Sequence, residues 1–109
     1  MATSRKILGQ KAPAAATWED LYTVPPMTDM VSSTISVTNR SATPDFFKIA
    51  FRKNGDPLEN KQYFAFDLEC PLNDIYLATA GFTFGAGDVI SVYNTNGTLT
   101  FQLFGQENS

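Results

Sequence analysis

Short segments in which apolar and polar residues alternate fill most of this chain, and turn-forming residues separate them. A period of two places successive side chains on opposite faces, which is typical of a β-strand with one buried face. In residues 31–39, for example, Val31, Ile35 and Val37 alternate with serine and threonine. The pattern predicts eight strands, at residues 6–10, 21–24, 31–39, 46–53, 62–68, 75–79, 89–93 and 99–103.

Proline, glycine, asparagine and aspartate mark the turns between these segments. Pro25 and Pro26 end the second strand, because neither can donate a hydrogen bond to a neighbouring strand. Residues 54–57 (Asn-Gly-Asp-Pro) are a strong turn signal, and residues 94–97 (Asn-Thr-Asn-Gly) predict a hairpin between the last two strands. About eight short antiparallel strands at this spacing predict an all-β fold, either a β-sandwich or a jelly-roll-like arrangement.

The length of 109 residues is that of one domain, which we place at residues 1–109 with flexible ends at 1–5 and 105–109. Aromatic residues make up 13% of the chain and supply much of the expected core. The residues expected to face inward are Val31, Ile35, Val37, Phe47, Ile49, Phe51, Phe64, Phe66, Ile75, Leu77, Val89, Leu99, Phe101 and Leu103.

Charge and hydropathy narrow the classes of partner. The net charge is −3, and the eight lysines and arginines are scattered rather than gathered in a stripe, which argues against nucleic acid as a partner. No apolar run reaches the roughly 18 residues that a membrane-spanning helix needs, and the first residues lack the apolar run of a signal peptide. We therefore expect synthesis in the cytoplasm and no membrane partner.

The chain offers little catalytic or metal-binding chemistry. It contains no histidine, and its single cysteine, Cys70, has no base to activate it, so we interpret Cys70 as a buried apolar residue. Asp67 and Glu69 share one strand face, as a pair of carboxylates for general acid–base catalysis would. Any two solvated carboxylates on an outer strand face would be arranged in the same way. The aspartates of the turns each stand singly, without the oxygen ligands that calcium requires: Asp56, Asp74 and Asp88. We expect no enzyme activity, no metal and no cofactor.

The aromatic residues support two hypotheses. Trp18, Tyr63, Tyr76 and Tyr93 are candidates for a sugar-stacking platform, or for core and subunit contacts. Phe46 and Phe47 are adjacent, so if Phe47 is in the core then Phe46 faces away from it. A domain with aromatics on both faces of its strands is either covered on both sides or meets a partner, which favours assembly. The alternative is that these aromatics only cap the sheet edges. The candidate interface consists of two outward-facing positions and three expected loop positions: Phe46 and Tyr63, and Trp18, Phe82 and Phe84.

Several segments together resemble small virion structural proteins of tailed bacteriophages. They include 6–10 (KILGQ), 21–25 (LYTVP), 47–52 (FKIAFR), 63–67 (YFAFD), 86–93 (AGDVISVY) and 100–105 (TFQLFG), and the similarity covers about residues 6–106. The resemblance implies a virion component assembled in the host cytoplasm. It favours a decoration or cement protein that forms a homotrimer and binds the major capsid protein. The alternative is a tail, baseplate or fibre module that contacts tail proteins and a host-surface carbohydrate.

Overall fold

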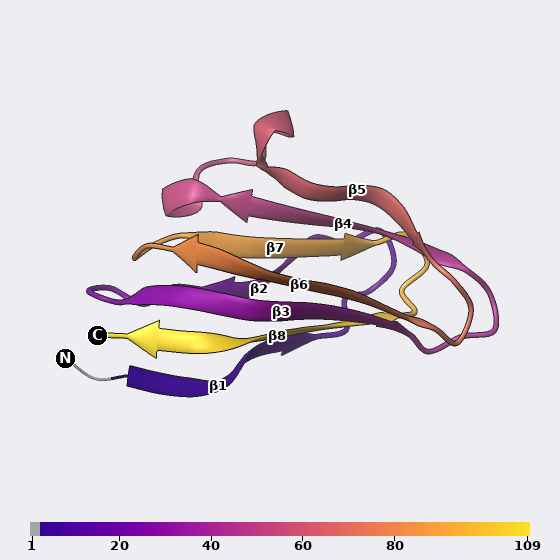
Figure 1. Ribbon diagram of the computed structural model, residues 1–109. Coiled ribbons are helices and arrows are strands. Elements are labelled where there is room, and N and C mark those ends of the chain that lie inside the picture. Colours follow the sequence, from indigo (N-terminus) through magenta and orange to yellow (C-terminus); the bar gives the residue numbers. More distant parts are fainter. Residues whose placement is uncertain (1–2) are drawn as a thin grey trace.

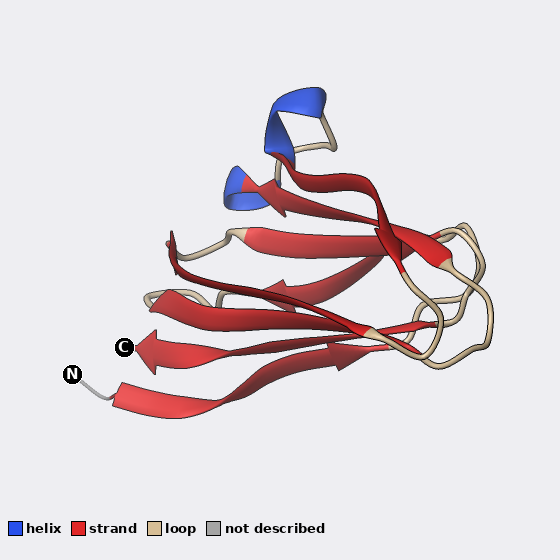
Figure 2. Ribbon diagram, turned by 45° about the vertical axis from the view of Figure 1, so that its right-hand side comes forward, coloured by secondary structure: helices blue, strands red, loops and turns tan. Residues whose placement is uncertain are grey.

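The computed structural model describes residues 3–109, which form eight strands in two antiparallel sheets (Figures 1 and 2). The strands are β1 (Thr3–Lys11), β2 (Glu19–Thr23), β3 (Asp29–Asn39), β4 (Asp45–Arg52), β5 (Tyr63–Cys70), β6 (Ile75–Phe84), β7 (Val89–Asn94) and β8 (Leu99–Asn108). Sheet A has the order β1-β8-β3-β6, and sheet B has the order β2-β7-β4-β5. The sequence prediction of an all-β sandwich with about eight strands is confirmed.

Two single 3-10 turns, η1 (Lys53–Gly55) and η2 (Asn60–Gln62), connect β4 to β5. They are the blue segments of Figure 2. No helix within residues 3–109 is long and apolar enough to cross a membrane.

The core fills the space between the two sheets. Alternation along the central strands points Ile35 and Val37 of β3, Phe47 and Ile49 of β4 and Phe101 of β8 inward, and all five side chains are buried. Val89, Leu99 and Leu103 are also buried, as predicted, whereas Phe51 is only partly buried. Further core residues are Leu21, Val24, Met30, Ala65, Cys70, Ile90 and Val92.

Five residues predicted to lie in the core are exposed instead: Val31, Phe64, Phe66, Ile75 and Leu77. On β6 the phase of the alternation was wrong, because Tyr76 and Ala78 pair with the inward-facing Val37 and Ile35 of β3. That pairing turns Ile75 and Leu77 outward.

Shifts in the pairing register explain the other three errors, at Val31, Phe64 and Phe66. The register between β3 and β8 shifts between Ser32 and Thr34, so that Ser32 is buried while its neighbour Val31 is exposed. Between β4 and β5 the register shifts twice within a few residues. Such irregularities change which face a side chain occupies, and simple alternation cannot follow them.

The two ends of the domain were predicted to be flexible, at residues 1–5 and 105–109. Residues 3–5 belong to β1 and residues 105–108 belong to β8, and the two strands pair with each other from Thr3 opposite Asn108 to Lys11 opposite Phe101. Residues 1 and 2 lie outside the described part. β1 and β8 are therefore neighbours in sheet A (Figure 1).

The predicted hairpin at 94–97 is also wrong, because β7 belongs to sheet B and β8 to sheet A. The turn crosses from one sheet to the other. The buried carboxylate of Asp45 holds it: Oδ1 accepts a hydrogen bond from the Asn96 N–H at 2.9 Å, and Oδ2 accepts one from the Thr98 hydroxyl at 2.8 Å. Gly97 has φ +77°, and a Cβ there would lie 2.8 Å from the Ala15 nitrogen. The residues of this turn therefore fit its contacts with Asp45 and Ala15, and they do not form a hairpin.

The two lateral flanks of the sandwich differ. On one side β1 and β2 close the gap between the sheets: a Cβ added at Gly9 would lie 2.3 Å from the backbone oxygen of Leu21, and Lys11 Nζ is 3.7 Å from Glu19 Oε1. We call this the closed flank. On the other side β5 and β6 are the outermost strands of their sheets. We call this the open flank.

Candidate functional site

An aromatic cluster covers the outer face of sheet B. Trp18 immediately precedes β2, and its ring centroid lies 5.4 Å from that of Tyr93 and 6.2 Å from that of Tyr63. Tyr63 in turn meets Phe66 edge to face at 4.8 Å. Tyr93 lies on the outer face because it alternates with the core residue Val92 along β7. Tyr63 reaches the same face because a register shift places it opposite Ala50 of β4. Residues from three separate segments therefore build one surface.

Lys48 lies at the centre of this cluster. Its side chain is only 18% exposed, and its Nζ lies 4.4 Å from the Tyr93 ring centroid and 5.1 Å from that of Phe66. The same Nζ forms an ion pair with Asp67 Oδ1 at 2.7 Å. Cation–π attraction and the ion pair together satisfy this ammonium group. Lys48 therefore supports the aromatic surface and has little capacity left for an anionic ligand.

A small pocket of about 220 Å³ adjoins the cluster and is lined by Trp18, Asp20, Arg52, Leu58 and Ser91. Arg52 Nη2 lies 3.6 Å from Asp20 Oδ1, and the Ser91 hydroxyl donates a hydrogen bond to the same oxygen at 2.9 Å. The Nε of Arg52 is buried and has no hydrogen-bond partner among the described residues. The pocket thus combines an indole ring with a carboxylate, a guanidinium and a hydroxyl group.

The five predicted interface residues fall into separate places. Trp18 and Tyr63 are brought together in the aromatic cluster, and Phe46 is 40% exposed on the same sheet. Phe82 and Phe84 were predicted to be loop residues, but both lie in β6, which is longer than the sequence predicted. They are partly buried and pack edge to face on Phe51, at 5.5 and 5.1 Å between centroids. They belong to the core margin and not to an exposed loop.

The sugar-stacking hypothesis named four aromatics, and the structure brings three of them together. Tyr76 is the exception, because it lies in sheet A and packs on Phe47 at 5.2 Å between centroids. The polar residues of the pocket were not identified from the sequence. Asp20, Arg52 and Ser91 come from β2, β4 and β7, so only the pairing of those strands brings them together.

The open flank presents an apolar surface. Ile75 and Leu77 of β6 are 50% and 57% exposed, and Phe64 and Leu68 of β5 are also exposed. A Cβ added at Gly81 of β6 would meet nothing within 4 Å. The ten residues of β6 (IYLATAGFTF) contain no charge and no proline. The other three outermost strands, β1, β2 and β5, all carry charged residues.

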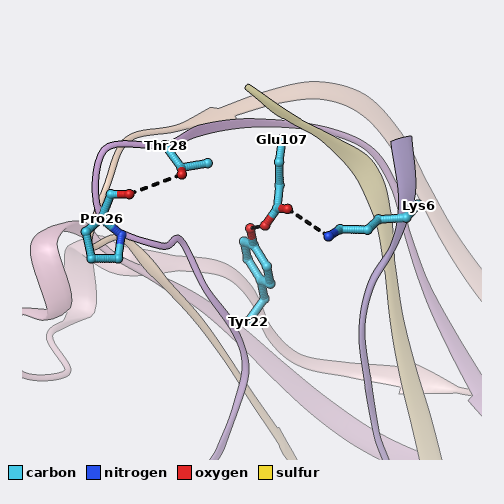
Figure 3. A network of polar contacts seen from close by, with 5 residues as sticks. All are labelled: Lys6, Tyr22, Pro26, Thr28 and Glu107. Carbon is cyan, nitrogen blue, oxygen red and sulfur yellow. Dashed lines mark hydrogen bonds and ion pairs between the residues drawn. The ribbon is translucent and has the colours of Figure 1, made fainter. Parts of the chain in front are cut away.

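A polar network on the closed flank joins β1, β2 and β8 (Figure 3). The Tyr22 hydroxyl donates a short hydrogen bond to the Glu107 carboxylate, and Lys6 Nζ lies 3.0 Å from the other oxygen of Glu107. The hydrogen bond from Tyr22, helped by Lys6, lowers the pKa of Glu107. Burial, together with Glu107, raises the pKa of Tyr22 well above its usual value. Neither group titrates near neutral pH, so the network is suited to holding strands rather than to proton transfer.

Cys70 is buried, as the sequence predicted, and burial raises the pKa of its thiol. Asp74 and Asp88 serve their turns: each accepts a hydrogen bond from a backbone N–H, that of Ile75 at 2.7 Å and that of Gly85 at 2.8 Å respectively. Within residues 3–109, no three Cys, Asp or Glu side chains gather as metal ligands would.

Comparisons with known proteins give no relative for this chain: no family model, no curated protein and no solved structure matches it. No relative therefore indicates which of the two surfaces, the pocket on sheet B or the open flank, is functional.

Proposed function

We propose that this chain is a non-enzymatic structural subunit of a phage particle, and that it associates with copies of itself through the open flank. The observation that carries the proposal is β6, a ten-residue outermost strand without charge or proline. An outermost strand has unpaired backbone N–H and C=O groups, and proteins usually protect such strands with charges, prolines or a covering segment. A long strand without these features is a surface for pairing with another chain.

The side chains of the open flank support the same proposal. Ile75, Leu77, Phe64 and Leu68 expose apolar surface beside the two unpaired strand edges. Burying exposed apolar surface stabilises association by roughly 25 cal/mol per Å². In a ring, β6 of one copy lies against β5 of the next, which is a heterologous contact that closes at a defined copy number. We expect three copies around a three-fold axis.

The place of this subunit in a particle is the decoration or cement layer of the head, where it binds the major capsid protein. The resemblance of residues 6–106 to virion proteins of tailed phages supports this placement. A clamp repeated around a symmetry axis multiplies weak contacts, and its binding stabilises the assembled shell by mass action. The alternative placement is a tail, baseplate or fibre module.

Light scattering after size-exclusion chromatography tests the self-association. We expect wild type to have the mass of a trimer, and we expect Leu77→Lys to shift it toward monomer, because a charge in the contact repels its neighbours. Gln10→Lys is the matched control: it adds the same charge to β1 on the closed flank and should leave the mass unchanged. A monomeric wild type at high concentration would overturn the proposal.

Antibody labelling of particles tests the placement. An antibody raised against the purified protein is applied to phage particles from the source culture and imaged by electron microscopy. Label over the head supports the decoration layer, whereas label confined to the tail supports the tail module. Particles without label, from a culture in which the protein is expressed, contradict both placements.

A further inference from the structure

We propose that the pocket formed by Trp18, Asp20, Arg52, Leu58 and Ser91 is a binding site for one ring of a neutral saccharide. Three observations on sheet B point to this ligand: the charge balance of the pocket, the supported tryptophan that forms one wall, and the hydrogen-bonding groups of Asp20 and Arg52 that line it. The inference does not depend on a role in a particle, because the pocket lies on the outer face of sheet B and not on the open flank.

The charges of the pocket select a neutral ligand. Asp20 and Arg52 neutralise each other at 3.6 Å, so an anion would meet the carboxylate and a cation would meet the guanidinium. Lys48 adds no free positive charge because Asp67 pairs with it at 2.7 Å. Sugar hydroxyl groups both donate and accept hydrogen bonds, which matches an acceptor and a donor placed side by side.

The tryptophan supplies the apolar wall. Trp18 is held by Tyr93 and Tyr63, with interplanar angles of 43° and 44°, so that its indole ring is fixed in position without being stacked face to face. A fixed aromatic ring loses little conformational entropy when a ligand packs against it. The carbon-bound hydrogens of a pyranose ring form an apolar face that fits such a wall, and Leu58 adds a second apolar contact.

Asp20 and Arg52 can each form further hydrogen bonds with a ligand. The Arg52 guanidinium carries five N–H donors, and Asp20 is the described residue with which it forms an ion pair, so the donors that line the pocket can meet a ligand. The Asp20 carboxylate accepts the Ser91 hydroxyl and the Arg52 contact on Oδ1, which leaves Oδ2 for a ligand. These groups can orient a ring of hydroxyls, as the few polar groups of a binding pocket typically do.

The size of the pocket restricts the ligand to one ring. Its volume of about 220 Å³ is below the roughly 300 Å³ at which pockets for drug-sized ligands begin. A longer oligosaccharide would continue across the exposed ring of Phe66, which joins the cluster through Tyr63. The geometry therefore points to recognition of a single neutral residue within a glycan.

Trp18 is the only tryptophan of the chain, so its fluorescence reports on this pocket directly. The experiment titrates a panel of methyl glycosides of neutral hexoses and N-acetylhexosamines into the millimolar range. We expect at least one of them to change the emission of Trp18 in a saturable manner. Glucuronic acid and glucosamine, which are charged at neutral pH, should bind more weakly by about tenfold or more.

Variants separate a true site from a general effect. Asp20→Asn and Arg52→Met should each weaken binding by about tenfold or more, because each removes a charged hydrogen-bonding group. Phe46→Leu is the matched control on the same sheet, since Phe46 does not line the pocket, and its affinity should equal that of wild type. Circular dichroism confirms that each variant is folded.

The titrations and the variants can each contradict the saccharide site. No saturable change with any neutral glycoside would overturn the inference, and so would equal binding of the charged sugars or unchanged affinity in Asp20→Asn and Arg52→Met. Leu77→Lys keeps failure of this inference separate from failure of the proposed assembly: it should bind the glycoside as wild type does, whatever its oligomeric state.

Discussion

The two flanks of the sandwich are built in opposite ways, and two glycines show the difference most directly. On the closed flank a Cβ added at Gly9 would lie 2.3 Å from the backbone oxygen of Leu21, whereas on the open flank a Cβ added at Gly81 would meet nothing within 4 Å. The same residue type marks close contact between strands on one side and free space on the other.

Charge follows the same division. The closed flank contains Lys6, Lys11 and Glu19 in its ion pairs, and the open flank ends in an uncharged β6. Charged outermost strands resist pairing with other chains, so this domain protects one flank and leaves the other able to associate. The difference lies in β6: on the open flank β5 still carries Asp67 and Glu69, whereas β6 has no charge or proline to prevent association.

The largest expected effect comes from substituting the two glycines in turn. Gly9→Ala should destabilise the fold by about 3 kcal/mol, because the nearest atom is backbone and β1 must move away from β2. Gly81→Ala should change stability by no more than about 0.5 kcal/mol. Urea unfolding followed by circular dichroism measures both. Equal losses in the two variants would show that the flanks are not different in packing.

A smaller effect is expected when the polar network of the closed flank is cut. Tyr22→Phe removes the hydrogen bond to the Glu107 carboxylate and should lower the free energy of unfolding by about 1.5 kcal/mol. Tyr76→Phe is the control, since no described residue accepts a hydrogen bond from the Tyr76 hydroxyl. If both variants lose the same stability, the network does not hold the flank.

The same network makes stability depend on pH at both ends of the scale. The pKa of Glu107 is lowered in the folded state, so its contribution is complete above about pH 4.3 and is lost as the pH falls through the folded value. The pKa of Tyr22 is raised, so its contribution is complete below about pH 10 and declines as the pH rises further. The stability difference between wild type and Tyr22→Phe should therefore be flat at neutral pH and shrink at both extremes. Unfolding curves across this range measure it, and a difference that is constant with pH would contradict the assignment.

The smallest effect concerns the open flank in the monomer. Leu77→Lys should change the stability of the isolated domain by no more than about 0.5 kcal/mol, because Leu77 is 57% exposed and makes few core contacts. Unfolding at a dilution where wild type is monomeric measures this. A loss of several kcal/mol would mean that Leu77 supports the fold rather than an interface.

The sequence predicts the strands well and their arrangement less well. All eight predicted strands occur, because alternation and turn residues are local signals, but β1, β6 and β8 extend further than predicted. The crossing of residues 94–97 between sheets was not predicted, since a hairpin turn and a crossing turn use the same residues. Val31 and Phe66 were misplaced because the register shifts near them, and such shifts depend on the partner strand.

The candidate site shows the same limit. Trp18 and Tyr63 were identifiable because aromatics outside the alternating core pattern suggest a surface role. Asp20, Arg52 and Ser91 were not, because a charged or hydroxyl residue on an outer strand face is ordinary by itself. Their significance arises only when β2, β7 and β4 lie side by side.

The position of β8 has a consequence for the synthesis of the protein. β8 is made after the other seven strands, yet it lies between β1 and β3 in sheet A. Until it emerges, β1 has no partner strand within its sheet and β3 lacks one of its two neighbours. Translation proceeds at about 5–20 residues per second, so for several seconds β1 stays unpaired and β3 stays paired on one side at most. Sheet A is thus completed only after all eight strands have been made, and a chaperone that binds extended apolar segments would meet β3 and β6 during that interval.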